Sequence, residues 1–573
     1  MRHAIRRFPR LWRMTRLLRR WYHAHRDAYP EWNELLAEGK ALLEMARTRS
    51  ATGDHILIST AVGSYAHAVT LESALAVALR LRGAEPHVLL CDSALPACAE
   101  CDFSLYPDLQ QFIDKGPSGD LCNHCYTPAQ RVYSLLGIRI HQISTLVSSS
   151  QRRQALDISK SVPFEKIKDL MHDGLNVGEH AFAGALRFFA TGSLDREPNA
   201  EPVLRRYLYS ALVTMFATRR LLKDQEFTCA VFTHGIYVPW GVIGQVCRQV
   251  GIRIANWNVA YRKRRFIFSH GDTYHHTLMS EPKSAWEGVE LTEHRERTLL
   301  DYLSSRRDGL FDWIVFHRAS AERKPNQLAE TLALDSERPV IGLLTNVSWD
   351  AQLHYPANAF PDMLDWIVRT CDYFSKRSDL QLLIRVHPAE ISGFPRSRQP
   401  VLQELLRRCP ELPSNITIVP PESSMSTYSL MSLCNAAIIY GTKMGVELAS
   451  VGLPVIVAGE AWVRNKGVTY DASTAEEYFD ILDRLPFSQS VQGSQLRRAR
   501  QYAYHFFFRR MIPLPFVKPR AGYPIYVLAL DRLETLLPGV SPGLDVICDG
   551  ILSGRPFTFE EERSAGKLAS TPH

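Results

Sequence analysis

The sequence lacks any uninterrupted apolar run of the roughly 18 residues that a membrane-spanning helix needs. No apolar segment or small-residue cleavage site follows the arginines near its beginning, so a signal peptide is not expected either. Hydrophobic residues make up 46% and charged residues 22% of the 573 residues, as in globular domains. These features exclude a membrane-spanning or a disordered chain and predict a folded protein of the cytoplasm.

A nucleic-acid-binding motif is also missing, and the net charge of +7 is modest for this length. Eight arginines lie within residues 1–20, so the rest of the chain is near neutral. We therefore expect no nucleic-acid partner. Apolar side chains such as Phe8, Leu11 and Trp12 stand between these arginines. The mixture favours either an amphipathic helix at the inner face of an anionic cytoplasmic membrane or a solvated basic extension.

The length exceeds that of one ordinary core and predicts two domains with appendages. Strand-like apolar runs alternate with helical segments, which is the pattern of parallel α/β sheets. The predicted parts are a basic amphipathic extension at 1–50, a first α/β domain at 51–335 with a cysteine-rich insertion at 91–125, a second α/β domain at 336–535 and a polar tail at 536–573.

Residues 382–460 give the strongest functional signal. Their strands end beside polar or small residues, and in open parallel sheets ligands bind at the carboxyl ends of strands. His387 ends one such strand, and Pro388 ends the regular pairing and fixes the histidine at the rim. An earlier strand ends at Asn346. This arrangement predicts that His387 contacts a phosphate or diphosphate group.

The helix that begins after YGTK, residues 440–443, completes this predicted site. Its amino end offers free N–H groups to a phosphate, and Thr442 and Lys443 add a hydroxyl and a cation. Glu447 lies one turn into the helix and is able to accept two hydroxyls of a ribose or a sugar.

Two histidines of the first domain are candidates for a general base. His67 lies in the first turn of a helix that follows a strand and a small-residue loop, which does not match a GxGxxG fingerprint. A packed or capping histidine is the alternative interpretation of His67. His234 stands beside Gly235 at the end of another strand. The basic run at 262–265 suits either the steering of an acidic acceptor or a solvated loop.

Two CxxC pairs form the most specific metal signal in the chain. Cys98 and Cys101 make one pair, and Cys122 and Cys125 make the other, about twenty residues later. Four thiolates at this spacing suit one structural zinc ion, and an iron–sulfur cluster uses the same ligands. Four free buried cysteines are the third interpretation, and disulfides are not expected in a cytosolic chain.

Several segments together resemble a known family. RVHPAE at 385–390, GVELASVGLPVIV at 445–457 and WVRNKGVTYDASTAEEYFDIL at 462–482 are similar to the C-terminal domain of bacterial capsule and surface polysaccharide biosynthesis proteins. These proteins are GT-B-type glycosyltransferases related to the capsular 3-deoxy-manno-octulosonate transferases. The resemblance implies two Rossmann-like domains that face a cleft, with the nucleotide-sugar donor held mainly by the second and the acceptor by the first.

The resemblance also implies roles for individual residues. The family's His-Pro motif maps to His387 and Pro388, and its turn followed by Gly and Glu maps to Gly441, Thr442, Gly445 and Glu447, listed in chain order. Relatives often carry a serine in this turn, whereas this chain has YGTKMG. No match to the acidic catalytic motif of the octulosonate transferases is found, which leaves the base unassigned.

The expected function is transfer of a sugar from a nucleotide-sugar to a surface polysaccharide or lipid-linked glycan. A nucleotide-sugar 2-epimerase is the first alternative, because such enzymes also use two domains of this kind with an HP turn. A non-catalytic polysaccharide assembly protein is the second, and it predicts no nucleotide binding.

Overall fold

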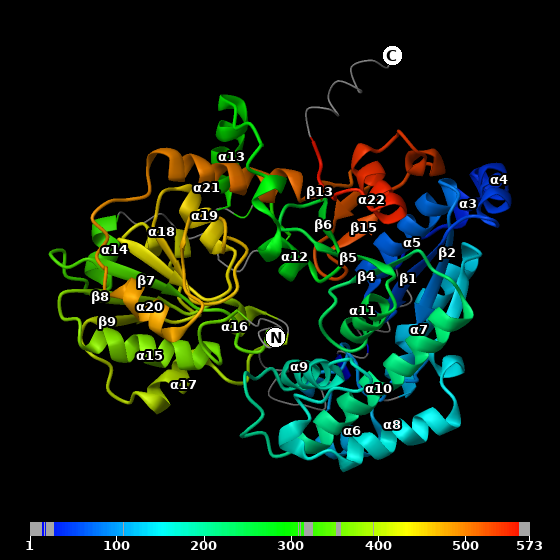
Figure 1. Ribbon diagram of the computed structural model, residues 1–573, viewed down its shortest axis with the longest axis horizontal. Helices are drawn as coiled ribbons and strands as arrows, with labels where there is room; N and C mark the ends of the chain where they lie inside the picture. Colours follow the sequence, from blue (N-terminus) through cyan, green and yellow to red (C-terminus); the bar gives the residue numbers. More distant parts are fainter. Residues whose placement is uncertain are drawn as a thin grey trace. The chain divides into compact units, whose positions relative to one another are not determined.

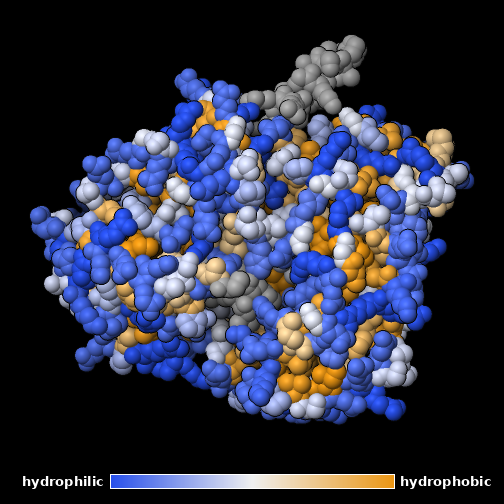
Figure 2. Space-filling model, in the orientation of Figure 1, coloured by the Kyte–Doolittle hydropathy of each residue, from blue (hydrophilic) through white to orange (hydrophobic). Residues whose placement is uncertain are grey.

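The computed structural model describes residues 14–15, 18, 28–106, 108–117, 119–306, 309, 311–313, 325–350, 357–393 and 395–560. Residues 1–27 of the predicted basic extension, apart from 14, 15 and 18, and residues 561–573 of the predicted tail lie outside these residues. In the described part of the chain, none of the helices has both the length and the hydropathy of a membrane-spanning segment. On the face shown in Figure 2, most residues are hydrophilic and the hydrophobic ones form separate groups.

The chain folds into two compact units (Figure 1). The first unit takes residues from 1–189, 194–277 and 510–573, and the second takes 190–193 and 278–509. These bounds differ from the predicted domains at two places, because the second unit begins at 278 instead of 336 and residues beyond 510 return to the first unit. There Ile512 of strand β13 pairs with Phe266 of strand β6.

The first unit contains a sheet in the order β13-β6-β5-β4-β1-β2-β3. Strands β1 to β5 pair in parallel, whereas β6 and β13 join by antiparallel pairing. The strands are β1 (His55–Ala61), β2 (Glu85–Leu90), β3 (Arg139–Gln142), β4 (Cys229–Thr233), β5 (Arg253–Val259), β6 (Arg265–His270) and β13 (Ile512–Pro513). The chain order reverses between β1 and β4, which defines a topological switch point.

Ten helices and a hairpin complete the description of the first unit. The helices are α3 (Asn33–Glu38), α4 (Lys40–Ser50), α5 (Ala66–Leu81), α6 (Leu109–Lys115), α7 (Gly119–Leu135), α8 (Ser149–Ser161), α9 (Val177–Phe189), α10 (Ala200–Asp224), α11 (Trp240–Gln249) and α22 (Pro542–Ser553). The hairpin consists of β14 (Val517–Pro519) and β15 (Tyr526–Leu528). Helix α12 (Tyr274–Ser280) carries the chain across the boundary between the units.

The second unit contains a parallel sheet in the order β12-β11-β10-β7-β8-β9. Its strands are β7 (Val340–Leu344), β8 (Gln381–Arg385), β9 (Ile416–Val419), β10 (Ala436–Ile439), β11 (Val455–Val457) and β12 (Tyr470–Asp471). Counted along the chain, this is the Rossmann order 3-2-1-4-5-6, with its switch point between β7 and β10. The expected Rossmann-like α/β architecture is confirmed.

Helices cover both faces of this second sheet (Figure 1). They are α13 (Glu293–Ser305), α14 (Pro325–Thr331), α15 (Met363–Ser375), α16 (Ala389–Ser392), α17 (Val401–Arg408), α18 (Thr427–Met431), α19 (Met444–Ser450), α20 (Ala475–Leu482) and α21 (Gly493–Tyr504). Helices α15, α17 and α20 lie on one side and α18, α19 and α21 on the other. Trp366 of α15 and Tyr478 of α20 are buried in the core beneath the sheet.

Candidate functional site

The switch point of the second unit brings together side chains that the sequence places far apart. The Asn346 side-chain oxygen, after β7, accepts a hydrogen bond from the Gly441 N–H, after β10, at 3.3 Å. The His387 N–H, after β8, donates to the Thr345 hydroxyl at 3.0 Å. Because β8, β7 and β10 are neighbours, three predicted donor-binding residues lie at one edge of the sheet.

His387 has a defined tautomer at this edge. Its Nδ1 accepts a hydrogen bond from the Ala389 N–H at 3.0 Å, so the neutral ring carries its proton on Nε2. Burial, helped by the positive charges of Lys443 and Arg385, lowers the pKa of His387 to about 4. His387 is therefore neutral at physiological pH and presents a hydrogen-bond donor rather than a charge. Pro388 is the next residue in the chain and is the N-cap of helix α16.

Lys443 is held by an ion pair. Its Nζ lies 2.8 Å from Oε1 of Glu447, one turn further along the chain, and its side chain is about one-fifth exposed at 19%. Burial, together with the charge of Arg306, lowers the pKa of Lys443, while Glu447 opposes this shift. The ion pair with Glu447 fixes the position of the ammonium group. The positive charge of this ammonium helps to lower the pKa of His387.

Glu447 is the centre of a buried charge network. Its Oε2 accepts hydrogen bonds from Arg306 Nε at 2.9 Å and from the Tyr428 hydroxyl at 2.7 Å. Burial alone would raise the pKa of Glu447, but Arg306 and Lys443 outweigh it and lower the pKa to about 2. Both oxygens of Glu447 already have cationic partners. Its predicted contact with sugar hydroxyls stays a prediction, whereas its contact with Lys443 is seen.

Arg306 links this glutamate to a second carboxylate. Its Nη1 lies 2.5 Å from Asp312 Oδ2 and donates to the Tyr302 hydroxyl at 2.7 Å. The Tyr302 hydroxyl in turn donates to Asp312 Oδ1 at 2.9 Å. Arg306 and Asp312 are each only 4% exposed. The guanidinium of Arg306 therefore forms ion pairs with two buried carboxylates, those of Asp312 and Glu447.

The predicted glycines have packing roles at this edge. A Cβ on Gly445 would stand 2.5 Å from Ile439 and 2.8 Å from Val463, so only glycine lets α19 approach β10 this closely. A Cβ on Gly441 would stand 3.2 Å from the Glu460 carbonyl oxygen. The Thr442 hydroxyl accepts a hydrogen bond from the Met444 N–H at 3.3 Å. These contacts hold the YGTK turn against the sheet.

The first unit carries the two predicted base candidates at the ends of β1 and β4. His234 has a positive φ of 66° and is followed by Gly235 at 80°, which turns the chain sharply after β4. The His234 and Tyr237 rings lie 5.1 Å apart. His67 packs among aromatic rings, with Tyr65 at 5.4 Å and Tyr523 at 6.1 Å.

Burial lowers the pKa of His67 to about 4. A base works best when its pKa is near the working pH, so this shift weakens His67 as a base. Its aromatic surroundings agree with the alternative of a packed histidine. Its assignment as a catalytic base, like that of His234, stays a prediction.

Arg187, which the sequence did not single out, lies at the switch point of the first unit. It donates to the Ala99 carbonyl oxygen, and its Nη2 donates to the Tyr65 hydroxyl at 3.4 Å. Its guanidinium lies 5.5 Å from the centre of the Tyr237 ring. Helix α9 thus brings a cation to the loops that follow β1 and β4. The amphipathic pattern of α9 gave no signal for this role, since Arg187 reads as an exposed helix residue.

A buried glutamate lies beneath the same loops. The two oxygens of Glu72 accept hydrogen bonds from the Thr60 hydroxyl at 2.6 Å and from Trp257 Nε1 at 2.9 Å. The hydroxyls of Thr60 and Tyr133 are 2.7 Å apart. Burial raises the pKa of Glu72 to about 7, against the opposing effect of these hydrogen bonds. Folding therefore favours its protonated form.

This raised pKa predicts a pH-dependent stability. The contribution of Glu72 is fully present below its unfolded pKa of about 4.5 and is lost as the pH rises through about 7, at a total cost of about 3 kcal/mol. Glu72→Gln removes this titration while it keeps hydrogen-bonding groups for Thr60 and Trp257. Urea unfolding at pH 5 and pH 9 is expected to show the variant gaining relative stability at the higher pH. A constant difference between the two proteins would contradict the assignment.

The predicted cysteines lie together in the first unit, and the zinc site that their spacing suggested stays a prediction. In the part of the chain that the structure describes, no three His, Cys, Asp or Glu side chains are arranged to hold a metal ion. Cys122 and Cys125 lie in helix α7 rather than on a loop. Together with Cys98 and Cys101 they line a small cavity of about 20 Å³, so the sulfurs surround a space. The segment between the pairs contains helix α6 and the buried ring of Phe112.

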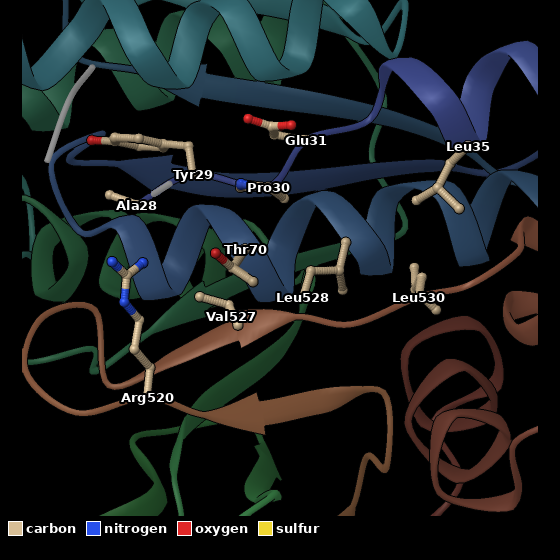
Figure 3. A pocket seen from close by; sticks show the side chains of 10 residues that line it. All are labelled: Ala28, Tyr29, Pro30, Glu31, Leu35, Thr70, Arg520, Val527, Leu528 and Leu530. Atoms are coloured by element: carbon tan, nitrogen blue, oxygen red, sulfur yellow. The ribbon is translucent and has the colours of Figure 1, made fainter. Parts of the chain in front are cut away.

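A larger cavity of about 400 Å³ lies elsewhere in the first unit (Figure 3). It is bordered by residues 28–35, helix α5 and the β14–β15 hairpin, and its lining is apolar apart from a few polar groups that include Glu31 and Arg520. None of the predicted site residues lines it. The candidate site is therefore built at the switch points and not at this cavity.

Comparison with known proteins finds similar structures but no matching sequence family. No protein-family model matches the chain, and a search of curated proteins finds no match. The KpsC beta Kdo 2,4 transferase of Thermosulfurimonas dismutans aligns at 13% identity over 49% of this chain and 80% of its own, with a TM-score of 0.33. The beta Kdo 2,7 transferase of the same KpsC aligns at 12% identity over 56% of this chain and 88% of its own, with a TM-score of 0.31.

Epimerases are also among the similar structures. The UDP-GlcNAc 2-epimerase of Neisseria meningitidis, bound to UDP-GlcNAc, aligns at 9% identity over 78% of this chain and 95% of its own, with a TM-score of 0.22. The two groups correspond to the transferases that the sequence motifs resemble and to the epimerases of the first alternative. At these low scores, neither activity is assigned to the chain from the likeness.

Proposed function

We propose that the protein transfers a sugar from a nucleotide-sugar donor to a surface polysaccharide or lipid-linked glycan. The observation that carries this proposal is the meeting of Asn346, His387 and Lys443 at the switch point of a Rossmann-ordered sheet. Nucleotides bind at such points because the loops after adjacent strands diverge there. The HP motif and the Gly-Glu helix start lie at this edge, in agreement with the family resemblance.

The site's chemistry suits departure of a nucleoside diphosphate. Nε2–H of His387 donates a hydrogen bond to a phosphate oxygen, and the ammonium of Lys443 supplies a positive charge. Glu447 acts through Lys443 by fixing its position. Donors that are already oriented stabilise the negative charge that grows on the leaving phosphate without further reorganisation. A metal ion at the phosphate is not needed for this role.

The acceptor is assigned to the first unit, where the loops after β1 and β4 bear His67, His234 and Arg187. The guanidinium of Arg187 suits an acidic group on the acceptor. His67 or His234 takes the proton of the attacking hydroxyl. We place the protein in the cytoplasm, with its N-terminal arginines against the anionic inner face of the membrane.

A thermal-shift screen of UDP, CMP, GDP and their sugars tests the proposal first. One nucleotide is expected to raise the melting temperature, because it binds only the folded protein. Lys443→Met is expected to lose most of that shift, whereas Lys376→Met, at an exposed lysine of the same unit, keeps it. A protein that responds to no nucleotide would instead fit the assembly role.

Product analysis with the bound donor then separates the two enzymatic activities. Release of free nucleotide together with a new glycosidic bond supports transfer. Interconversion of the donor sugars without an acceptor would make the protein an epimerase and overturn the proposal.

A further inference from the structure

Arg385 is the last residue of strand β8 and stands two positions before His387. The side chains of this strand that enter the core beneath the sheet are Leu382 and Ile384. Successive side chains of a strand point to opposite faces, so Arg385 and His387 share the other face. Helices α18 and α19 cover that face (Figure 1), and Lys443 is the N-cap of α19. Arg385 therefore lies at the same edge and on the same face of the sheet as the predicted phosphate contacts.

The guanidinium of Arg385 holds a turn and not a carboxylate. Its Nη1 donates to the Pro420 carbonyl oxygen at 2.6 Å, and its Nη2 donates to the Ser423 carbonyl oxygen at 3.2 Å. The Ser423 N–H also donates to the Pro420 oxygen at 3.1 Å, which closes the turn after β9. Nε of Arg385 is buried and has no hydrogen-bond partner among the residues that the structure describes. A guanidinium has more N–H groups than the two carbonyl contacts use, so donors remain for a ligand.

Arg385 also carries a buried charge. The residue is 3% exposed, and it forms no ion pair within the described part of the chain. Glu422 is the carboxylate whose charge acts on it, but Glu422 is exposed to solvent. Burial lowers the pKa of Arg385 to about 10, and Glu422 opposes this shift only in part. The charge of Arg385 therefore costs folding free energy as long as no counter-ion is bound, because a buried charge is costly unless it is paired.

The other charges at this edge balance one another. Lys443 pairs with Glu447, and Arg306 pairs with both Glu447 and Asp312. Two cations thus meet two carboxylates, and this network has no net charge. His387 is neutral at physiological pH. The positive charge that remains without a counter-charge at this edge is that of Arg385.

We propose that Arg385 binds the phosphate of the nucleotide-sugar donor and balances its negative charge. This inference rests on the proposed function, which places the phosphate at His387 and Lys443. Glu447 already compensates the charge of Lys443, so Lys443 and His387 act as oriented donors and Arg385 supplies the charge that is not compensated. A guanidinium suits this role because its planar set of N–H groups matches the oxygens of a phosphate.

Isothermal titration calorimetry measures the contribution of this charge. Arg385→Gln is expected to weaken the binding of UDP, CMP or GDP, whichever the protein binds, by about 10- to 100-fold, the effect of one hydrogen bond to a charged group. Arg385→Lys keeps the charge but cannot hold both carbonyl oxygens in the same way, and it is expected to regain most of the lost affinity. An affinity of Arg385→Lys as low as that of Arg385→Gln would assign Arg385 to the turn alone and overturn the proposal.

Arg407→Gln is the matched control for these variants. Arg407 lies on α17 of the same unit, is 49% exposed and pairs with Glu404 at 3.0 Å. It is expected to keep the full nucleotide affinity. An equal loss of affinity in Arg407→Gln and Arg385→Gln would show that any lost cation has this effect, and would refute a specific contact.

Urea unfolding without nucleotide separates a binding role from a structural one. The free energy of unfolding of Arg385→Gln is expected to equal or exceed that of the unsubstituted protein, because the variant no longer buries an unpaired charge. A residue that served only to hold the turn would lower the stability when replaced. A large loss of stability in Arg385→Gln, or its failure to fold, would therefore also overturn the proposal.

Inorganic pyrophosphate separates this inference from the proposed function. Pyrophosphate is expected to bind the unsubstituted protein, to compete with the nucleotide and to bind Arg385→Gln more weakly. If pyrophosphate binding needs Arg385 but none of the nucleotides binds, the anion site stands and the proposed function fails. If nucleotide affinity is the same in the unsubstituted protein and Arg385→Gln, the proposed function stands and Arg385 is not part of its site.

Discussion

Replacement of Arg306 by methionine is expected to lower the free energy of unfolding of the second unit by about 3 to 5 kcal/mol. The guanidinium lies 2.9 Å from Glu447 and 2.5 Å from Asp312, and all three side chains are 4% exposed. Methionine fills much of the same volume but leaves two buried carboxylates without their shared cation. Removal of one partner of a buried charge network costs far more than loss of an exposed pair, since the remaining charges stay desolvated.

Denaturant unfolding followed by circular dichroism measures this loss. Arg297→Met on α13 is the matched control, because Arg297 is 64% exposed and pairs with Glu293 on the helix surface. Its expected cost is below about 1 kcal/mol. Equal stability of Arg306→Met and Arg297→Met would show that the network contributes nothing to folding.

The pH dependence gives a second readout of this network. The pKa of Glu447 is lowered to about 2, so its stabilising contribution is present above about 4.5 and is lost as the pH falls towards 2. In Arg306→Met, acid instead relieves the defect, because protonation neutralises Asp312 and Glu447, which have lost the cation that they share. The difference in the free energy of unfolding between the unsubstituted protein and Arg306→Met is therefore expected to become smaller as the pH falls.

The residues at the carboxyl ends of the second unit's strands could be predicted from the sequence, because each follows directly after a recognisable strand. Strands β7, β8 and β10 are short apolar runs that end beside polar or small residues, and chain order in a parallel sheet brings such ends together. His387 and Lys443 were found in this way. Arg306 was not, because its segment is charged and weakly patterned, and its contact with Glu447 spans 141 positions. Spacing within one element carries no signal for such a pair.

Strand β13 and the cysteine pairs also differ from what the sequence predicted, and each difference has a physical cause. Strand β13 has two residues, Ile512 and Pro513, and a strand this short has no period from which its return to the first unit could be predicted. The CxxC spacing predicted that four cysteines gather, and they do. It did not predict that Cys122 and Cys125 lie on a helix, because a two-residue spacing is compatible with a helix as well as with a loop.

Removal of the His387 side chain is expected to lower kcat for sugar transfer by about 10² to 10³-fold, the usual effect of losing one oriented donor to a developing anion. His387→Gln is the matched variant, because its side-chain amide keeps an N–H donor, and it is expected to retain more activity than His387→Ala. Lys443 remains paired with Glu447 in both variants, so nucleotide affinity is expected to change less than kcat. Full activity in His387→Ala would remove His387 from the reaction.

The protonation state of His387 determines whether it supplies a neutral hydrogen-bond donor or a positive charge. The pH dependence of kcat reports that state. Burial, Lys443 and Arg385 lower its pKa to about 4, so the ring stays neutral from pH 5 upwards. If His387 donates from Nε2 as a neutral ring, the ratio of kcat between the unsubstituted protein and His387→Gln stays constant from pH 5 to pH 8. A charged imidazolium would lose its proton within this range, and the ratio would then fall as the pH rises. A constant ratio therefore shows that His387 contributes a directed hydrogen bond and not a positive charge.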